Sequence, residues 1–198
     1  MSLAKEDSLA APGAGLPLPE LLAARLLFAF RRCTGDVESF TRNFNRERAA
    51  IRRLVDGCGE EFLAKRILIR RLPGMEDSSR NWSMLMTLDH LRIVQKEFIR
   101  VIEALGNGIV PEGKASTAVV KPSPEVSAAV IAEYESSCDG LLEAVAAIPN
   151  MKTGTKFTHP WFGQLDAFAW HALSGVHLRI HRKQIEQILK VLARPSAS

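Results

Sequence analysis

The sequence predicts an all-α protein, a four-helix bundle with long crossover connections and an extra helix before the bundle. Apolar residues recur at helical spacing in several long segments, and no segment shows a convincing alternation of period two. The single Tyr and the scarcity of alternating Val, Thr and Ile also argue against a β-rich fold. Two long connections between long amphipathic helices indicate a bundle with at least one crossover.

Residues 1–16 are expected to form a flexible arm, and residues 17–198 a single helical-bundle domain. The arm contains Ala, Pro and Gly but neither the basic start nor the long apolar core of a secretory signal. The apolar stretch from Leu21 to Phe30 is too short to span a bilayer and is interrupted by Arg25. With 46% hydrophobic and 24% charged residues, the 198-residue chain has the composition of one globular domain.

The first three expected helices cover residues 18–33, 36–56 and 60–71. Each has apolar residues at helical spacing and ends near Gly or Pro. Asp36 can supply the N-cap carboxylate of the second helix, and Pro73 follows the end of the third.

The last three expected helices run over residues 80–105, from Pro124 to Pro149, and from a cap at Asp166 to about Ala193. The helix over 80–105 has one broad apolar face and is followed by a Gly-Asn-Gly stop. Pro suits the first turn of the next helix, because its missing N–H has no helical partner there. Two long connections separate these helices: residues 107–124 and 149–164.

Three histidines are expected to face the core. His177 and His181 are four residues apart, so both lie on one helix face, and His90 lies on the apolar stripe of the helix over 80–105. A buried imidazole needs hydrogen-bond partners, and neutral imidazole is a common ligand of zinc, nickel and iron. Three histidines around an ion leave positions open for water or substrate. The spacing alone also allows hydrogen-bonded core histidines.

Three other residues are weighed for roles near such a site. Glu97 is two turns after His90 on the same stripe, where it can orient a ligand, act as a catalytic proton carrier, or pair with an arginine across the bundle. His159 precedes a proline in the stretch 159–163 and is a candidate fourth ligand, lid residue or turn residue. His171 lies off the His177 face and is expected at the rim.

Charge and cysteine usage narrow the class of protein. Cys33, Cys58 and Cys138 are odd in number, widely separated and without metal-binding spacing, which indicates reduced thiols in a soluble, cytoplasmic protein. The net charge of +4 is mild and the arginines are scattered, so a nucleic-acid partner is not expected. The short apolar stretch described above gives no reason to expect a membrane partner. There is no Gly-rich phosphate loop and no G-x-S-x-G motif.

Two short stretches carry a family resemblance. The segment from Asn81-Trp82-Ser83 to Leu88-Asp89-His90-Leu91, and the later H-x-x-x-H-x-x-Q-I from His177 to Ile185, resemble the DinB/YfiT-like superfamily. The stretch 158–163 looks like the connection in one branch of that family, and the resemblance covers roughly residues 36–193. It implies a four-helix bundle, often dimeric, with a divalent metal held by His90, His177 and His181. The helix before Asp36 is not part of the usual core, and it is expected either to cover one end of the bundle or to form a dimer contact.

The resemblance leads to one main functional hypothesis. Its relatives include thiol-dependent S-transferases and isomerases and a metal-dependent hydrolase. We therefore expect a homodimeric metal-dependent enzyme, in which a zinc, nickel or iron ion activates water or a low-molecular-weight thiol against a small-molecule substrate. The alternative is a non-catalytic dimeric helical protein whose histidines are structural or bind a structural metal. A nucleic-acid surface formed by the arginine-rich helices is a third, weaker hypothesis.

Overall fold

The computed structural model describes residues 9–193. Its helices are α1 (Leu18–Thr34), α2 (Val37–Asp56), α3 (Glu60–Ala64), η1 (Asp77–Ser79), α4 (Met84–Gly106), α5 (Val130–Ala146) and α6 (Ala167–Leu192). Its strands are β1 (Ile67–Leu68), β2 (Asn81–Trp82), β3 (Phe157–His159) and β4 (Gly163–Leu165). The strands form two separate antiparallel pairs, β1 with β2 and β3 with β4.

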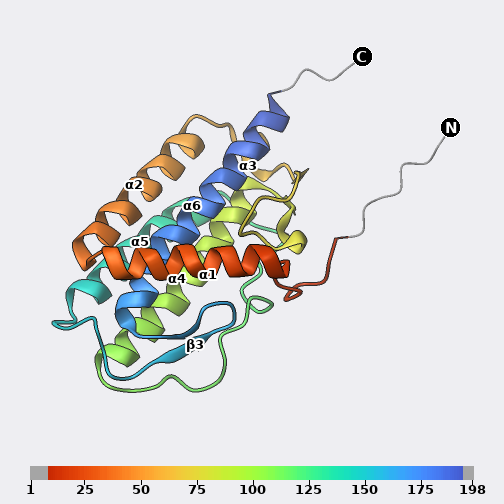
Figure 1. Cartoon of the computed structure of the whole chain (residues 1–198). Helices are drawn as coiled ribbons and strands as arrows, with labels where there is room; N and C mark the ends of the chain where they lie inside the picture. The colour runs from red at the N-terminus through yellow and green to blue at the C-terminus, as the bar shows by residue number, and fades with distance from the viewer. Residues whose placement is uncertain (1–8, 194–198) are drawn as a thin grey trace, which may run out of the picture.

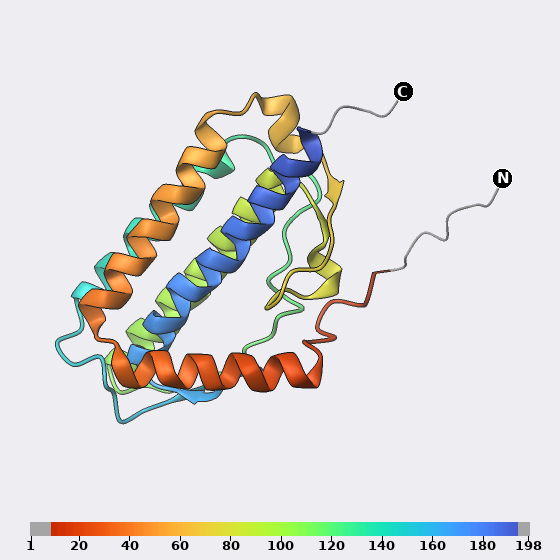
Figure 2. The same ribbon diagram turned by 45° about the horizontal axis from the view of Figure 1, so that its top comes forward.

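The long helices α2, α4, α5 and α6 form a four-helix bundle, and α1 lies across one end of it (Figures 1 and 2). Helix α4 packs against both α5 and α6, while α2 packs against α6. The core is apolar, as the contact of amphipathic faces requires, and it includes fully buried side chains from all four helices. Examples are Phe44, Ile51, Leu91, Ile102, Leu141, Ile185 and Ile188. The predicted all-α bundle with an extra N-terminal helix is confirmed.

Helix starts follow the expected capping chemistry. Asp36 accepts a hydrogen bond from the backbone N–H of Ser39, whose hydroxyl accepts from the Asp36 backbone N–H in return, a complete capping box. Asp166 accepts from the Ala169 N–H at 2.9 Å and so caps α6. Ser83 caps α4 through the Met86 N–H. These three side chains satisfy N–H groups that have no partner inside the helix.

The structure corrects the expected third helix and the start of the fourth. Helix α3 ends at Ala64 rather than residue 71, and β1 then pairs with β2, so that α4 begins at Met84. The Ile69 N–H donates to the Arg80 carbonyl at 3.0 Å, and Arg80 Nε donates back to the Ile69 carbonyl. These hydrogen bonds between Ile69 and Arg80 take the place of helical hydrogen bonds in this segment. Strands this short give no readable alternation in sequence.

Helix α5 begins at Val130, six residues after the expected start at Pro124. The Ser123 backbone N–H donates to the Asp89 carboxylate of α4 at 3.0 Å, which holds the preceding chain against α4 instead of in a helical turn. The expected connection over 149–164 contains the β3–β4 hairpin, which was not predicted.

Helix α1 is attached to the rest of the protein at several points. Arg25 Nε donates to the Trp161 carbonyl in the β3–β4 hairpin at 2.6 Å, and the rings of Phe28 and Phe162 lie 4.7 Å apart. Glu20 forms an ion pair with Arg71. Helix α1 therefore covers the hairpin from outside the bundle.

The chain before α1 also makes contacts. The backbone N–H of Ala10 donates to Asp77, and that of Gly13 donates to Glu76. Residues 1–8 of the expected flexible arm lie outside the described residues, so the division into arm and domain stays a prediction. Within residues 9–193, every helix is too short or too polar to cross a bilayer.

Candidate metal centre

Helices α4 and α6 bring His90, His177 and His181 together. One nitrogen from each ring lies within 4.8 Å of the others, and the Nε2 atoms of His90 and His177 are 3.2 Å apart. His90 is in the second turn of α4, and the other two lie one turn apart in the middle of α6. The structure thus brings together the three histidines that the sequence selected, and their role as metal ligands stays a prediction.

A carbonyl of the crossover connection fixes the protonation of His90. Its Nδ1 lies 2.5 Å from the Val120 carbonyl oxygen. A carbonyl can only accept, so the ring hydrogen must be on Nδ1 and the lone pair on Nε2. The lone pair of His90 consequently points at His177.

His181 is oriented in the same way through Gln184. The Gln184 amide nitrogen donates to the Ser79 carbonyl at 2.8 Å, so its oxygen is the atom that faces His181 Nδ1 at 2.7 Å. That oxygen accepts the Nδ1 hydrogen and leaves the His181 lone pair on Nε2. Gln184 is fully buried, so both of its hydrogen bonds are shielded from water.

The spacing of the nitrogens fits coordination of one cation. Two nitrogens that each lie about 2.0–2.1 Å from a tetrahedral ion are about 3.3 Å apart, close to the 3.2 Å between His90 and His177. His90 and His181 are buried, while His177 is half-buried. The set therefore fits a divalent metal, with the accessible side next to His177.

Burial keeps these imidazoles neutral. It lowers the pKa of His181 to about 4, an effect that the bond to Gln184 partly offsets. Burial and the neighbouring imidazoles hold the pKa values of His90 and His177 well below the ordinary value. At neutral pH all three rings therefore keep the lone pair that a metal needs.

An indole lies between two of these histidines and a buried ion pair. The Trp82 ring is 5.1 Å from His90 and stacks on His181 at 6.2 Å, centroid to centroid. The Lys121 ammonium lies 5.6 Å from the centroid of the Trp82 ring. The same ammonium donates to the Glu76 carboxylate at 2.8 Å. Trp82 thus packs two histidine rings against apolar surface and separates them from the ion pair.

Glu76 holds the crossover connection in place. This buried carboxylate accepts from Thr117 and Lys121 of the connection and from the Gly13 N–H before α1. Burial alone would raise the pKa of Glu76, but the bonds from Lys121 and Thr117 outweigh it and the pKa is lowered. The anchored connection then presents the Val120 carbonyl to His90. No sequence spacing pointed to Glu76, Val120 or Lys121, because they meet only through the path of a long loop.

Glu97 does not join the histidines. Its side chain is half-exposed and pairs with Arg100 on the same helix at 3.0 Å. The expected pairing with an arginine is present, but on α4 itself and not across the bundle. The position of Glu97 therefore does not support its expected catalytic role.

The other two histidines lie nearby in different settings. His159 accepts the Trp161 N–H at Nδ1, so its hydrogen is on Nε2 and this form offers no free lone pair to a metal. His159 is in strand β3, and its ring centroid lies 5.4 Å from that of Trp170. His171 is fully buried and bonds Thr41 through Nε2 at 2.9 Å, so the expected rim position was wrong. It points toward α2, which covers it.

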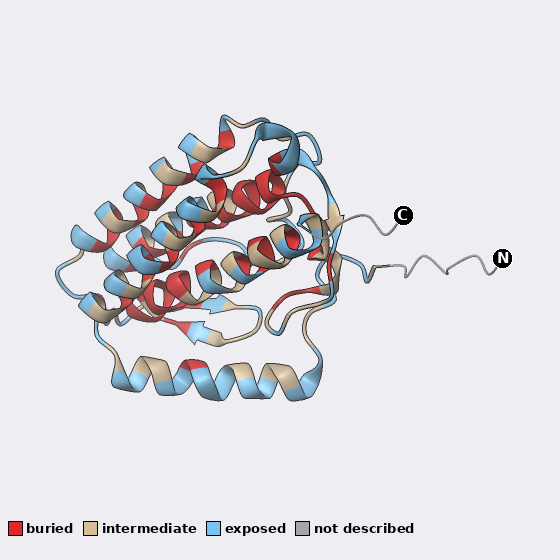
Figure 3. Ribbon diagram, turned by 90° about the horizontal axis from the view of Figure 1, so that it is seen from above, coloured by how far each residue is buried: buried red, intermediate tan, exposed pale blue. Residues whose placement is uncertain are grey.

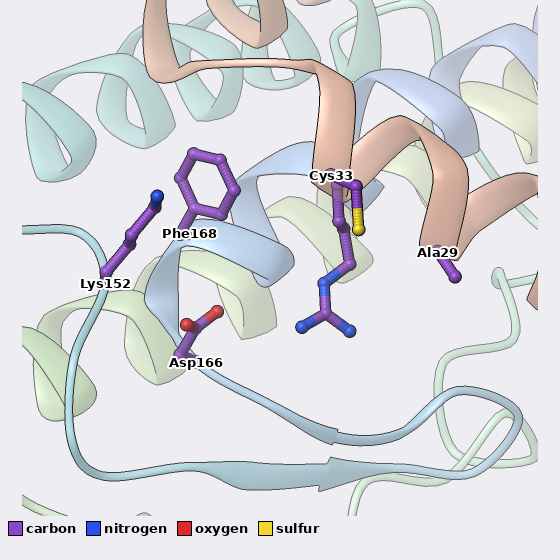
Figure 4. Close-up of a pocket in the computed structure, with 6 residues that line it drawn as sticks. Ala29, Cys33, Lys152, Asp166 and Phe168 are labelled. Atoms are coloured by element: carbon purple, nitrogen blue, oxygen red, sulfur yellow. The ribbon is translucent and has the colours of Figure 1, made fainter.

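A cavity of about 290 Å³ lies elsewhere, where the end of α1 meets the start of α6 (Figure 4). It is lined by Ala29, Arg32, Cys33, Lys152, Asp166 and Phe168. None of the three clustered histidines lines it. The candidate centre is thus defined by converging nitrogens rather than by this hollow.

Comparisons with known proteins agree with this architecture. A family model described as the DinB superfamily matches residues 43–185. A solved structure described as "Crystal structure of TT2238, a four-helix bundle protein" is 20% identical, with a TM-score of 0.57, and the match covers 76% of this chain and 98% of that chain. At this identity the likeness supports the fold alone. No curated protein matches the chain.

Proposed function

Because the chain belongs to the DinB superfamily, we propose that it is a metal-dependent enzyme in which His90, His177 and His181 hold a divalent ion. One observation carries the proposal: two rings are locked in the tautomer that leaves the lone pair on Nε2, in a cluster where one nitrogen of each ring lies within 4.8 Å of the others. The Val120 carbonyl locks His90, and Gln184 locks His181. Histidines kept only for packing do not need lone pairs that converge.

The accessible side of the centre is at His177. No described residue bonds its Nδ1, so this ring can carry its hydrogen on either nitrogen. With the hydrogen on Nε2 it donates to His90, and with the hydrogen on Nδ1 it offers a third lone pair. His177 therefore permits both a metal-free and a metal-bound arrangement without moving its neighbours.

The reaction classes that suit this centre are hydrolysis and thiol-dependent S-transfer. A bound zinc, nickel or iron ion would act as a Lewis acid and lower the pKa of a coordinated water or low-molecular-weight thiol. The protein supplies neutral ligands, the buried Trp82 ring on one side and, at the half-buried His177, the least enclosed of the three ligands. Three neutral ligands leave the ion its full charge, which favours such activation.

The decisive experiment is elemental analysis of protein purified without a polyhistidine tag or added metal. We expect close to one equivalent of a transition metal, and its loss in His90→Ala and His177→Ala. His171→Gln is the matched control, since His171 is buried on the same helix but outside the cluster. Metal retained by both alanine variants, or no uptake by the wild type on titration, would overturn the proposal.

The reaction class can be tested with the same preparations. S-transfer requires that a thiol is consumed in step with an electrophile, whereas hydrolysis proceeds with water alone. Metal-loaded wild type and His177→Ala are compared with an electrophile panel, with and without a small thiol. Turnover that depends on His177 and on the thiol assigns S-transfer, and turnover without thiol assigns hydrolysis.

We propose two further properties, a reducing compartment and a homodimer. Cys33, Cys58 and Cys138 are all unpaired, which suits a reducing compartment such as the cytoplasm. The family resemblance suggests a homodimer. Size-exclusion chromatography with light scattering tests the second of these directly.

A further inference from the structure

Helix α1 differs from an ordinary surface helix in which side chains face the solvent. Its large apolar side chains face outward: Leu18, Leu22, Leu26, Leu27 and Phe30 are 57–74% exposed. Phe28 is the only residue of α1 that is buried. Figure 3 shows α1 at the edge of the molecule, with most of its residues coloured as exposed or intermediate.

The charged residues of α1 are instead engaged with the rest of the chain. Glu20 pairs with Arg71, and Arg25 donates to the Trp161 carbonyl. The guanidinium of Arg31 lies 5.3 Å from the Phe40 ring centroid, and that of Arg32 lies 5.8 Å from the Phe28 centroid. All four charged residues of this helix are thus drawn away from the outer stripe, which is left apolar. A monomer rarely exposes a contiguous apolar face of this kind.

We propose that this stripe is the contact between two copies of the chain, with the α1 helices packed antiparallel about a two-fold axis near Ala24. The inference extends the homodimer proposed above by assigning its surface, and it does not depend on the metal. Leu18, Leu22, Leu26 and Phe30 recur every four residues. Such a ridge packs into the matching groove of an identical helix.

The pattern is self-complementary under that axis. Reversal about Ala24 sets Leu22 opposite Leu26 of the partner subunit and Leu18 opposite Phe30 of the partner subunit. Each contact then occurs twice, as a two-fold interface requires. The pairs at the centre are aliphatic, and the larger Phe ring is at the ends.

The area suffices for a dimer. Five such side chains expose roughly 500–600 Å² of apolar surface per chain, so a two-fold contact buries roughly 1,000–1,200 Å² before flanking atoms are counted. Stable interfaces begin at about 1,200 Å² in total. Exposed Pro19, Ala23 and Ala29 beside the stripe supply the remainder.

A membrane surface fits this helix less well. Interfacial helices present Lys and Arg beside the apolar face, where they meet anionic headgroups. Here Arg25, Arg31 and Arg32 interact with the protein's own carbonyl and rings. A second copy needs no flanking charge.

Sedimentation equilibrium of the full chain tests the assignment. The wild type should have twice the mass of one chain at micromolar concentrations, and Leu22→Glu/Leu26→Glu should raise the dissociation constant by about 100-fold or more, because both changes bury charge at the centre. Leu22→Ala/Leu26→Ala should weaken association in the same direction. The matched control is Phe62→Glu, which replaces another exposed apolar residue on α3, at the other end of the bundle (Figure 2).

The outcomes separate this surface from the other proposals. A monomeric wild type would overturn the dimer, and vesicle binding by that monomer would assign the stripe to lipid. A dimer that persists in both double variants would overturn the assignment of the contact to α1, but not the dimer itself. A monomeric Leu22→Glu/Leu26→Glu with native circular dichroism, beside a dimeric Phe62→Glu, supports it. Metal content measured on the same samples reports separately on the histidine centre.

Discussion

Gln184 accepts the Nδ1 hydrogen of His181 at 2.7 Å while its amide nitrogen donates to the Ser79 carbonyl. The segment before α4 thereby sets the orientation of a side chain on α6, which in turn sets the protonation of a candidate ligand. Loss of such an outer partner typically lowers metal affinity by about 10- to 100-fold.

Replacing Gln184 by Leu should weaken metal binding by about 10- to 100-fold, because His181 loses the acceptor that keeps its lone pair on Nε2. The affinity is measured by competition with a chromophoric chelator. Gln95→Leu is the matched control: Gln95 is also buried, but its amide contacts Cys138 and not a histidine. Equal affinities in the two variants would contradict the orienting role of Gln184.

Glu76→Gln should lower the free energy of unfolding by about 2–3 kcal/mol, because it leaves the largely buried Lys121 ammonium without its counter-ion. The measurement is urea unfolding of the metal-free protein. The double variant Glu76→Gln/Lys121→Met should lose less than the single one, since no buried charge then remains unpaired. Additive losses would show that the two residues act independently.

Acid should destabilise the fold through His171, whose pKa burial lowers from 6.5 to about 4. Below pH 6.5 His171 binds a proton in the unfolded chain, but in the folded chain it stays neutral until about pH 4. The free energy of unfolding therefore falls across that interval. His171→Gln should reduce this fall by up to about 3 kcal/mol between pH 7 and pH 4.

The check compares urea unfolding of metal-free wild type and His171→Gln at several pH values. Only the difference in pH dependence reports on His171, since the other buried histidines contribute equally to both proteins. Parallel pH profiles would contradict the assignment.

Gly175→Ala should destabilise the protein by about 1–3 kcal/mol through overpacking where α6 approaches α2. An added Cβ would lie 2.4 Å from Asn43 Nδ2 and 3.3 Å from the Phe44 backbone nitrogen. Gly140→Ala on α5 is the control: its Cβ would meet only the Ile99 Cδ1 at 3.3 Å.

The two glycine variants should differ in sign. Alanine gains up to about 1 kcal/mol over glycine inside a helix, so Gly140→Ala should be neutral or stabilising. Thermal unfolding of both gives the comparison. A neutral Gly175→Ala would mean that Asn43 and its backbone move aside at no cost.

Parts of the secondary structure escaped prediction for a common reason. The β1–β2 and β3–β4 pairs have two or three residues per strand, too few for a readable alternation, and β1 pairs with a strand that lies beyond η1 in the chain. The late start of α5 likewise follows from the contact of Ser123 with Asp89. Local patterns carry no information on such partners.

Glu97 illustrates the limit of helical periodicity. It lies within about 20° of His90 around the helix axis, since seven residues make nearly two turns. Every residue from Met84 to Leu91 is nevertheless buried, because neighbouring elements surround the start of α4. Farther along, the same direction is open, and Glu97 meets Arg100 there.

The sequence by itself determined the helical class, the capped starts of α2 and α6, and the three histidines that share one location. The helical class, the caps and the shared face of His177 and His181 depend on spacing within a helix, which residue order sets directly, whereas the packing of α4 against α6 brings His90 to them. Only the tertiary structure decided which groups orient the histidines and which way α1 faces. Val120 reaches His90, and Ser79 reaches Gln184, through long-range hydrogen bonds. The outward apolar stripe of α1 depends on which of its faces the rest of the chain leaves uncovered.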